Sequence, residues 1–153
     1  MVHLRDFPDK ARETLVNQDL PEYQTTPCVD GPPLASRRIA LITTAGLHRR
    51  EDKVFAAGVG DYRIIPNDTD PNDLVMSHVS TNFDRTGFHQ DVNLVFPVDR
   101  LNEIQGEGEV GSVADYHYAF MGATPPTAQD AVARDVAGLL KNDNVDGVIF
   151  CPV

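Results

Sequence analysis

The run of apolar and β-branched residues at 38–44, RIALITT, constrains the fold of this chain more than any other feature. A continuous run of this kind is typical of a strand covered on both faces. Near the C-terminus, the strand-like segment Tyr116–Met121 is followed by an amphipathic helix that opens at Pro125-Pro126-Thr127, and then by a second buried strand, Val145 to Phe150. Strand, helix, strand is the unit of parallel α/β sheets. We therefore predict an α/β fold with a Rossmann-like, mostly parallel sheet flanked by helices.

Weaker patterns predict the remaining elements. The polar stretch at 77–91 is long for a loop in a compact domain, and such loops often carry function. Elsewhere we predict a short helix at Asp9–Asn17, strands at Tyr62–Ile65 and Asp73–His78, and a helix that opens at Pro97 and shows Val98, Leu101 and Ile104 on one face.

The chain divides into two parts of different composition. Residues 1–36 are polar and rich in proline, and we expect them to form an extended arm, whereas residues 37–153 form the α/β domain. The chain ends at Cys151-Pro152-Val153, on the carboxyl end of a predicted central strand, where open α/β sheets place their ligands. We therefore expect a sheet that is incomplete at the C-terminus, and a chain that is the N-terminal part of a longer product.

Charge and hydropathy narrow the possible partners and the compartment. The formal charge is -10 and the acidic residues are scattered, which disfavours nucleic acid and anionic membranes as partners. No apolar run approaches the ~20 residues that span a bilayer, and the N-terminus lacks the apolar stretch of a signal peptide. We expect a cytoplasmic protein whose two cysteines, Cys28 and Cys151, are thiols.

Histidines cluster at predicted strand ends or in the long loop: His48, His78, His89 and His117. With Asp84 and Asp91 they could supply a metal site, since imidazole and carboxylate are common ligands of zinc. They could equally bind a substrate carboxylate, transfer protons, or hydrogen-bond nearby backbone. Their spacing matches no metal motif, and the sequence leaves these alternatives open.

Cys151 is a candidate nucleophile because it follows a buried strand, at the end where a thiol would face the ligand site. One further residue beyond Val153 would complete a C-x-x-X spacing, and a cysteine or selenocysteine there would make a redox pair. The alternative is a buried cysteine that acts as a small apolar residue.

Six segments in order resemble the selenoprotein B family of the glycine, sarcosine, betaine and D-proline reductases. The similarity covers about residues 30 to 153. The segments are RRIALITTAGLH (37–48), YRIIPNDT (62–69), SHVSTNFD (77–84), DVNLVFPVDRLNEI (91–104), GEVGSVADYHYAFMG (108–122) and VDGVIFCPV (145–153).

The resemblance implies a selenocysteine, or a cysteine in its place, just after Val153. Selenocysteine is encoded by UGA, and a UGA read as a stop would end the chain where it ends. The resemblance also implies an oxidoreductase in which Cys151 resolves oxidised selenium while His48, His78 and His117 orient a carboxylate or shuttle protons. Substrate-binding positions carried over from the motifs are Asp84, Asp91, Asn93 and Arg100.

The family's chemistry is the reductive cleavage of a C–N bond, with a dithiol as the electron source. It implies an amine or amino-acid-derived substrate, a pyruvoyl-containing partner subunit and a thiol reductant protein, and we expect a homo-oligomer. On this interpretation the chain alone is inactive. Two other interpretations remain: a small α/β module that binds a metal or ligand through its histidines, and an interaction subunit that scaffolds a partner through its exposed sheet edge.

Overall fold

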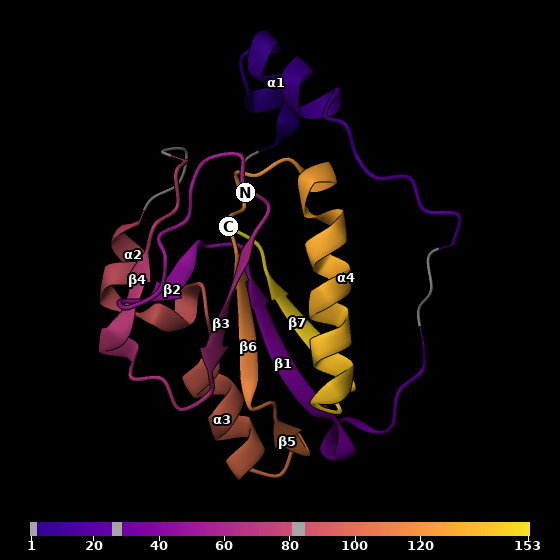
Figure 1. Ribbon diagram of the computed structural model, residues 1–153, viewed down its shortest axis with the longest axis vertical. Helices are drawn as coiled ribbons and strands as arrows, with labels where there is room; N and C mark the ends of the chain where they lie inside the picture. Colours follow the sequence, from indigo (N-terminus) through magenta and orange to yellow (C-terminus); the bar gives the residue numbers. More distant parts are fainter. Residues whose placement is uncertain (1–2, 26–28, 81–84) are drawn as a thin grey trace.

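The computed structural model describes residues 3–25, 29–80 and 85–153. Its centre is a sheet built around β1 (Arg38–Thr43). β7 (Gly147–Cys151) pairs in parallel along one edge of β1. On the other edge, β5 (Ser112–Val113) pairs with the start of β1 and β6 (Tyr116–Phe120) with its end, both in parallel. β3 (Tyr62–Pro66) completes the sheet, antiparallel to β6 (Figure 1).

The α/β class is confirmed, but the mostly parallel, Rossmann-like sheet is wrong, because the sheet is mixed. Parallel strands of one sheet require a crossover connection, and α4 (Pro126–Asn142) provides one from β6 to β7, which lie on opposite edges of β1. The stretch between β1 and β3 holds the short β2 (Leu47–Arg49) and no helix, and β3 lies antiparallel. A short apolar run such as YRIIP carries no signal of strand direction.

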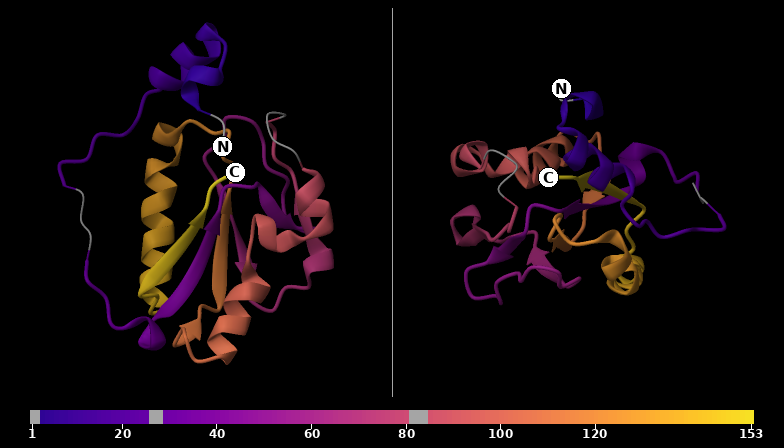
Figure 2. Two further views of the ribbon diagram at one scale, coloured as in Figure 1. Left: turned by 180° about the vertical axis from the view of Figure 1, so that it is seen from behind. Right: turned by 90° about the horizontal axis from the view of Figure 1, so that it is seen from above.

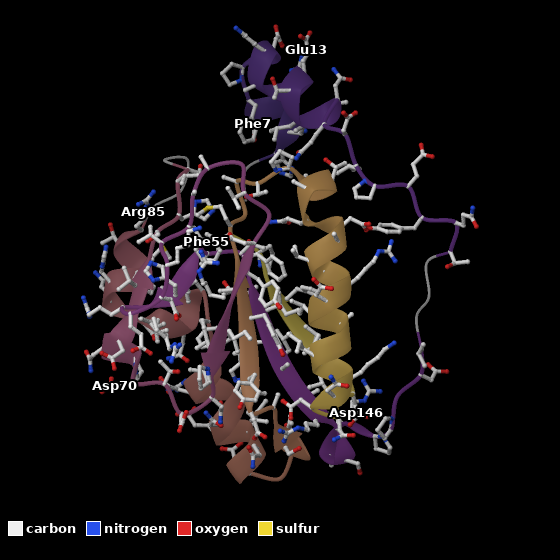
Figure 3. All side chains as sticks on the ribbon, viewed as in Figure 1. Phe7, Glu13, Phe55, Asp70, Arg85 and Asp146 are labelled. Atoms are coloured by element: carbon white, nitrogen blue, oxygen red, sulfur yellow. The ribbon has the colours of Figure 1, made fainter. Side chains whose placement is uncertain are left out.

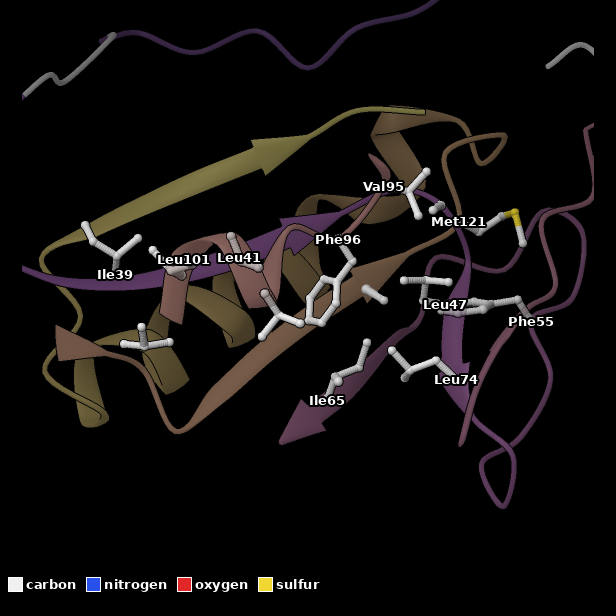
Figure 4. Close-up of a cluster of buried hydrophobic side chains, with 14 of the residues drawn as sticks. Ile39, Leu41, Leu47, Phe55, Ile65, Leu74, Val95, Phe96, Leu101 and Met121 are labelled. Atoms are coloured by element: carbon white, nitrogen blue, oxygen red, sulfur yellow. The ribbon is translucent and has the colours of Figure 1, made fainter. Parts of the chain in front are cut away.

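Two layers cover the sheet because side chains alternate along β1. Ile42 faces α4 and packs with Tyr118, Phe120 and Val136. Leu41 faces the other side, where α3 (Val98–Gly106) and the β2–β4 ribbon supply the larger core (Figure 4). The two-stranded ribbon pairs β2 with β4 (Leu74–Met76) in antiparallel register.

The remaining elements are short and lie around this body. α1 (Asp9–Val16) stands away from the sheet, and the N-terminal segment passes outside α4, as two further views show (Figure 2). Within the described part of that segment, one side-chain hydrogen bond reaches the body, from Tyr23 Oη to Asp130 Oδ1 at 3.3 Å. The other elements are α2 (Thr86–Gln90) and the 3₁₀ turns Leu4–Asp6, Leu34–Ser36, Pro71–Asp73 and Val92–Leu94.

His117 fills a break in the sheet. Between β5 and β6 the backbone leaves the edge of β1, and the Leu41 N–H donates to His117 Nδ1 at 3.0 Å instead of to a strand carbonyl. The other ring nitrogen, Nε2, lies 3.0 Å from Asn67 Oδ1 and donates to it. The ring is fully buried and stacks edge-on against Phe96. Burial lowers the pKa of the His117 imidazole to about 4.

We predict that His117 makes the fold sensitive to acid. Its pKa is about 4 in the folded chain and near 6.5 when unfolded, so the folded state prefers the neutral ring. Its contribution to stability is complete above pH 6.5 and declines as the pH falls towards 4, by up to about 3 kcal/mol. Chemical denaturation at pH 7.5, 6, 5 and 4.5 measures the decline.

The variant His117→Gln separates this effect from the titration of other groups. It retains hydrogen-bonding capacity without a group that titrates in this range, and its stability should fall less steeply with pH. Equal slopes for His117→Gln and the wild type would contradict the assignment.

Candidate functional site

The carboxyl ends of β1, β6 and β7 meet in a group of residues that we call the strand-end cluster: Thr44, Gly46, His78, Met121, Gly122, Cys151 and Val153. Backbone bonds join the three strands there. The Thr44 N–H donates to the Cys151 carbonyl at 3.1 Å, and the Gly122 N–H donates to the Thr44 carbonyl at 2.8 Å. This is the end of the sheet at which we predicted the ligand site from the sequence.

Thr44 fixes the segment that follows β7. Its Oγ1 accepts from the Val153 N–H at 2.8 Å and donates to the Val153 carbonyl at 3.3 Å. Gly122 lies against the same segment, and a Cβ added to it would come within 2.7 Å of the Val153 carbonyl oxygen. The backbone beyond Cys151 is therefore held by a side chain and by a close approach that only glycine allows.

Cys151 is partly buried at the end of β7. Burial raises the pKa of its thiol above the usual value. A thiol with a raised pKa is mostly protonated at neutral pH and is a weak nucleophile until a base or an approaching group ionises it.

His78 reaches the cluster from the segment that follows β4. Its backbone lies 3.1 Å from a Cβ built on Gly46, which has φ +66°, a conformation that favours glycine. The ring is 4% exposed, and its Nδ1 accepts from the Ser80 N–H at 3.2 Å. Burial lowers the pKa of His78, as does the positive charge of Arg85, while the bond from Ser80 opposes the shift.

Arg85 hydrogen-bonds the backbone of the segment that carries His78. Its Nη2 donates to the carbonyls of His78 and Ser80, both at 2.6 Å. Figure 3 shows Arg85 at the same end of the molecule as Phe55, which packs against His48 with ring centroids 6.4 Å apart. Arg85 was not singled out from the sequence, although it directly follows the motif SHVSTNFD.

His48 is buried in β2, with both ring nitrogens engaged. Nδ1 lies 2.7 Å from the Arg49 carbonyl, and Nε2 lies 2.7 Å from Ser77 Oγ. Ser77 is adjacent to His78, and its N–H donates to the Gly46 carbonyl at 3.0 Å. His48 thus lies beside the strand-end cluster and reaches it through Ser77, a residue that we did not single out from the sequence.

Among the residues that the structure describes, the other predicted site residues do not reach this cluster. His117 is the second residue of β6, away from its carboxyl end, with both nitrogens bonded as described above. His89 is exposed on α2. Asp84 lies outside the described residues.

Asp91, Asn93 and Arg100 belong to a turn and a helix surface. Asp91 Oδ1 accepts from the Asn93 N–H, and Asn93 Oδ1 accepts from the Asp99 N–H at the start of α3. The hydrogen bond from Asn93 is the main reason that the pKa of Asp91 is lowered. Arg100 is exposed and pairs with Glu103 at 2.9 Å. Their contacts indicate that the DVN part of the motif orders the entry into α3.

The metal alternative finds no support in the described ranges. Among residues 3–25, 29–80 and 85–153, no three His, Cys, Asp or Glu side chains form a group that could hold an ion. In the same ranges no helix is long and apolar enough to cross a bilayer.

Comparison with known proteins identifies the family. The family model for glycine/sarcosine/betaine reductase selenoprotein B matches residues 17–152. The chain belongs to this selenoprotein B family.

Three proteins similar to the chain show how much of each protein it shares. The D-proline reductase subunit gamma of Acetoanaerobium sticklandii is 32% identical over 120 residues, which cover 76% of this chain and 49% of that protein. The glycine reductase complex component B subunit gamma of Symbiobacterium thermophilum is 31% identical over 141 residues, 86% of this chain and 32% of that protein. The betaine reductase complex component B subunit beta of Peptoclostridium acidaminophilum is 29% identical over 123 residues, which cover 76% of this chain and 28% of that protein.

This selenoprotein B chain therefore spans about half, or less, of the length of these relatives. Each relative is named as a component of a reductase. No solved structure matches the chain significantly.

We predict that Thr44 controls access to Cys151. Thr44→Val keeps the shape of the side chain but removes both bonds to Val153, at a cost of about 1 kcal/mol of stability. The released segment should let an alkylating reagent reach Cys151 several times faster. The measurement is the alkylation rate in a Cys28→Ser background.

Thr127→Val, the same substitution at an exposed position on α4, serves as the control and should leave the rate unchanged. Equal alkylation rates for Thr44→Val and the wild type would show that Thr44 does not limit access of the reagent to the Cys151 thiol.

Proposed function

We propose that this chain forms part of an oxidoreductase component of the glycine, sarcosine, betaine or D-proline reductase type, which cleaves a C–N bond reductively. Family membership over residues 17–152 is the observation that carries the proposal. It is supported by the strand-end cluster, in which Cys151 ends β7 and the backbone of His78 lies against Gly46, just after β1. The cluster lies where open α/β sheets bind their ligands.

A selenocysteine or cysteine directly after Val153 in the full-length product is part of the proposal. The described residues fit such a group: Thr44 fixes the backbone of Val153, and Cys151 precedes the position at the spacing of a redox pair. A selenol would supply a nucleophile that is already ionised at neutral pH. The raised pKa of Cys151 suits the other half of the pair, a resolving thiol that stays protonated until it is needed.

The proposal assigns roles to three residues of this chain. Cys151 acts as the resolving thiol. His78, held over Gly46 and Met121, orients the substrate carboxylate or exchanges protons, and His48 supports it through Ser77. Overall, the substrate exchanges a C–N bond for a C–H bond, the amine leaves with a proton, and a dithiol that becomes a disulfide supplies the two electrons.

The proposed partners follow from the same assignment. The named relatives are subunits of multi-component reductases, which supports a role within a protein complex. We propose a pyruvoyl-containing subunit that binds the substrate amine, a thiol reductant protein, and self-association into a homo-oligomer.

The assay that tests this function uses the full-length product with its co-purified subunits and dithiothreitol as the dithiol. Glycine, sarcosine, betaine and D-proline are offered one at a time. We expect one of them to be consumed with one dithiol oxidised per molecule. If the intact complex consumes none of the four, the proposed reaction class is wrong.

We predict that Cys151→Ser lowers turnover in that assay at least about tenfold, because a hydroxyl cannot resolve an oxidised chalcogen. Cys28→Ser, the same change at the chain's other cysteine, is the matched control and should retain wild-type turnover. Unchanged turnover in Cys151→Ser would remove Cys151 from the mechanism while leaving the reaction class in place.

A further inference from the structure

Ser77 and His48 form a hydrogen-bonded pair whose direction is fixed while the His48 ring is neutral. The Arg49 carbonyl can only accept, so His48 Nδ1, 2.7 Å from it, carries a proton. In the neutral ring, Nε2 is then an acceptor, and Ser77 Oγ at 2.7 Å must donate to it. The structure thus defines a hydroxyl, a base and a group that orients the base, which is the geometry of an activated hydroxyl.

The two members differ in their access to solvent. His48 is 2% exposed, packed against Phe55, whereas Ser77 is only partly buried. A buried imidazole cannot exchange protons freely with a ligand, but it can do so through the hydroxyl bonded to it. Ser77 is therefore the outer end of the pair.

The pair lies against the carboxyl end of β6, across β1 from the end of β7, where Cys151 lies. The Ser77 N–H donates to the Gly46 carbonyl, and the Gly46 N–H donates to the Phe120 carbonyl at the end of β6 at 2.9 Å. Beyond the pair, Asp52 is held by Arg49 at 2.9 Å and interacts electrostatically with His48.

We propose that Ser77 and His48 form a proton relay that serves the strand-end cluster, a proposal that rests on the proposed function. The substrate class is a primary or secondary amine whose nitrogen needs a proton as its C–N bond breaks. Ser77 gives its hydroxyl proton to that nitrogen, and the His48 imidazolium returns its Nε2 proton to Ser77 Oγ. The ring ends neutral with the proton on Nδ1, as in the arrangement described above; water then returns a proton to Nε2 through the Ser77 hydroxyl, and no electrons move.

The first test needs no catalysis and uses this chain as it is. Nitrogen-15 NMR of the imidazole side chains distinguishes the two neutral tautomers, and the relay requires His48 to carry its proton on Nδ1. Ser77→Ala should move the His48 Nε2 resonance, whereas Ser112→Ala, a matched change at the opposite end of β1, should not. A His48 with its proton on Nε2 would overturn the proposal.

The second test measures turnover in the full-length complex. Ser77→Ala and His48→Gln should each lower kcat by about 10²-fold with little change in KM, because proton transfer contributes to that extent. Ser77→Thr keeps the hydroxyl and should regain most of the lost rate. The double variant should be no slower than the worse single variant, since the two groups act as one unit.

The outcomes separate the relay from a structural role and from the proposed function. A Ser77→Ala enzyme with kcat within twofold of wild type, or losses that multiply in the double variant, would overturn the relay. A wild-type complex that reduces no amine would overturn the proposed function instead. The tautomer of His48 would then be the test of the hydrogen-bonded arrangement of Ser77 and His48.

Discussion

The pairing of β1 on both of its edges is the constraint on which the rest of the structure depends. β7 pairs with β1 from Ile39 to Thr43, while β5 and β6 share the opposite edge. The gap that this division leaves is closed by His117, which replaces a strand carbonyl as the partner of the Leu41 N–H. A neutral, fully buried imidazole is thus part of the sheet's hydrogen bonding, and its lowered pKa is the electrostatic consequence.

The same pairing aligns the strand ends that make the candidate site. Because β1, β6 and β7 are parallel, their carboxyl ends lie together, and Thr44 links the segments that follow β6 and β7. The β2–β4 ribbon then brings His48, Ser77 and His78 to this end from a separate pair of strands. The central strands fix the backbone, and the ribbon supplies the polar groups.

The elements with strong apolar patterns were predictable from the sequence. β1, α4 and β7 lie within one or two residues of the segments expected for them, because apolar runs mark the two strands and a helical repeat marks α4. The expectation that the last strand is buried at the centre of the sheet was wrong: among the described strands β7 pairs with β1 alone, and its Phe150 is 70% exposed. The direction of β3 was not predictable, since strand orientation depends on the connections and not on composition. α2 was missed because its five residues, inside an otherwise polar loop, carry no amphipathic repeat.

The site was predictable in part. The expectation that strand ends converge led to Cys151 and His78. In the sequence, Cys151 was marked by the apolar run that precedes it, and His78 by the motif SHVSTNFD. The same expectation misplaced His117, which lies near the amino end of β6, away from the carboxyl ends at which open α/β sheets bind ligands. Ser77 and Arg85 are recognised only from their hydrogen bonds, which join residues of different segments across the fold.

The reductase assignment is tested most directly by the intact mass and selenium content of the product of the native gene, expressed in a selenium-supplemented host. The account predicts a product heavier than the 16.8 kDa of this chain, with one selenium atom placed by peptide mapping directly after Val153. A longer product with cysteine there would leave the mechanism in its thiol form. A product with neither residue at that position would contradict the account.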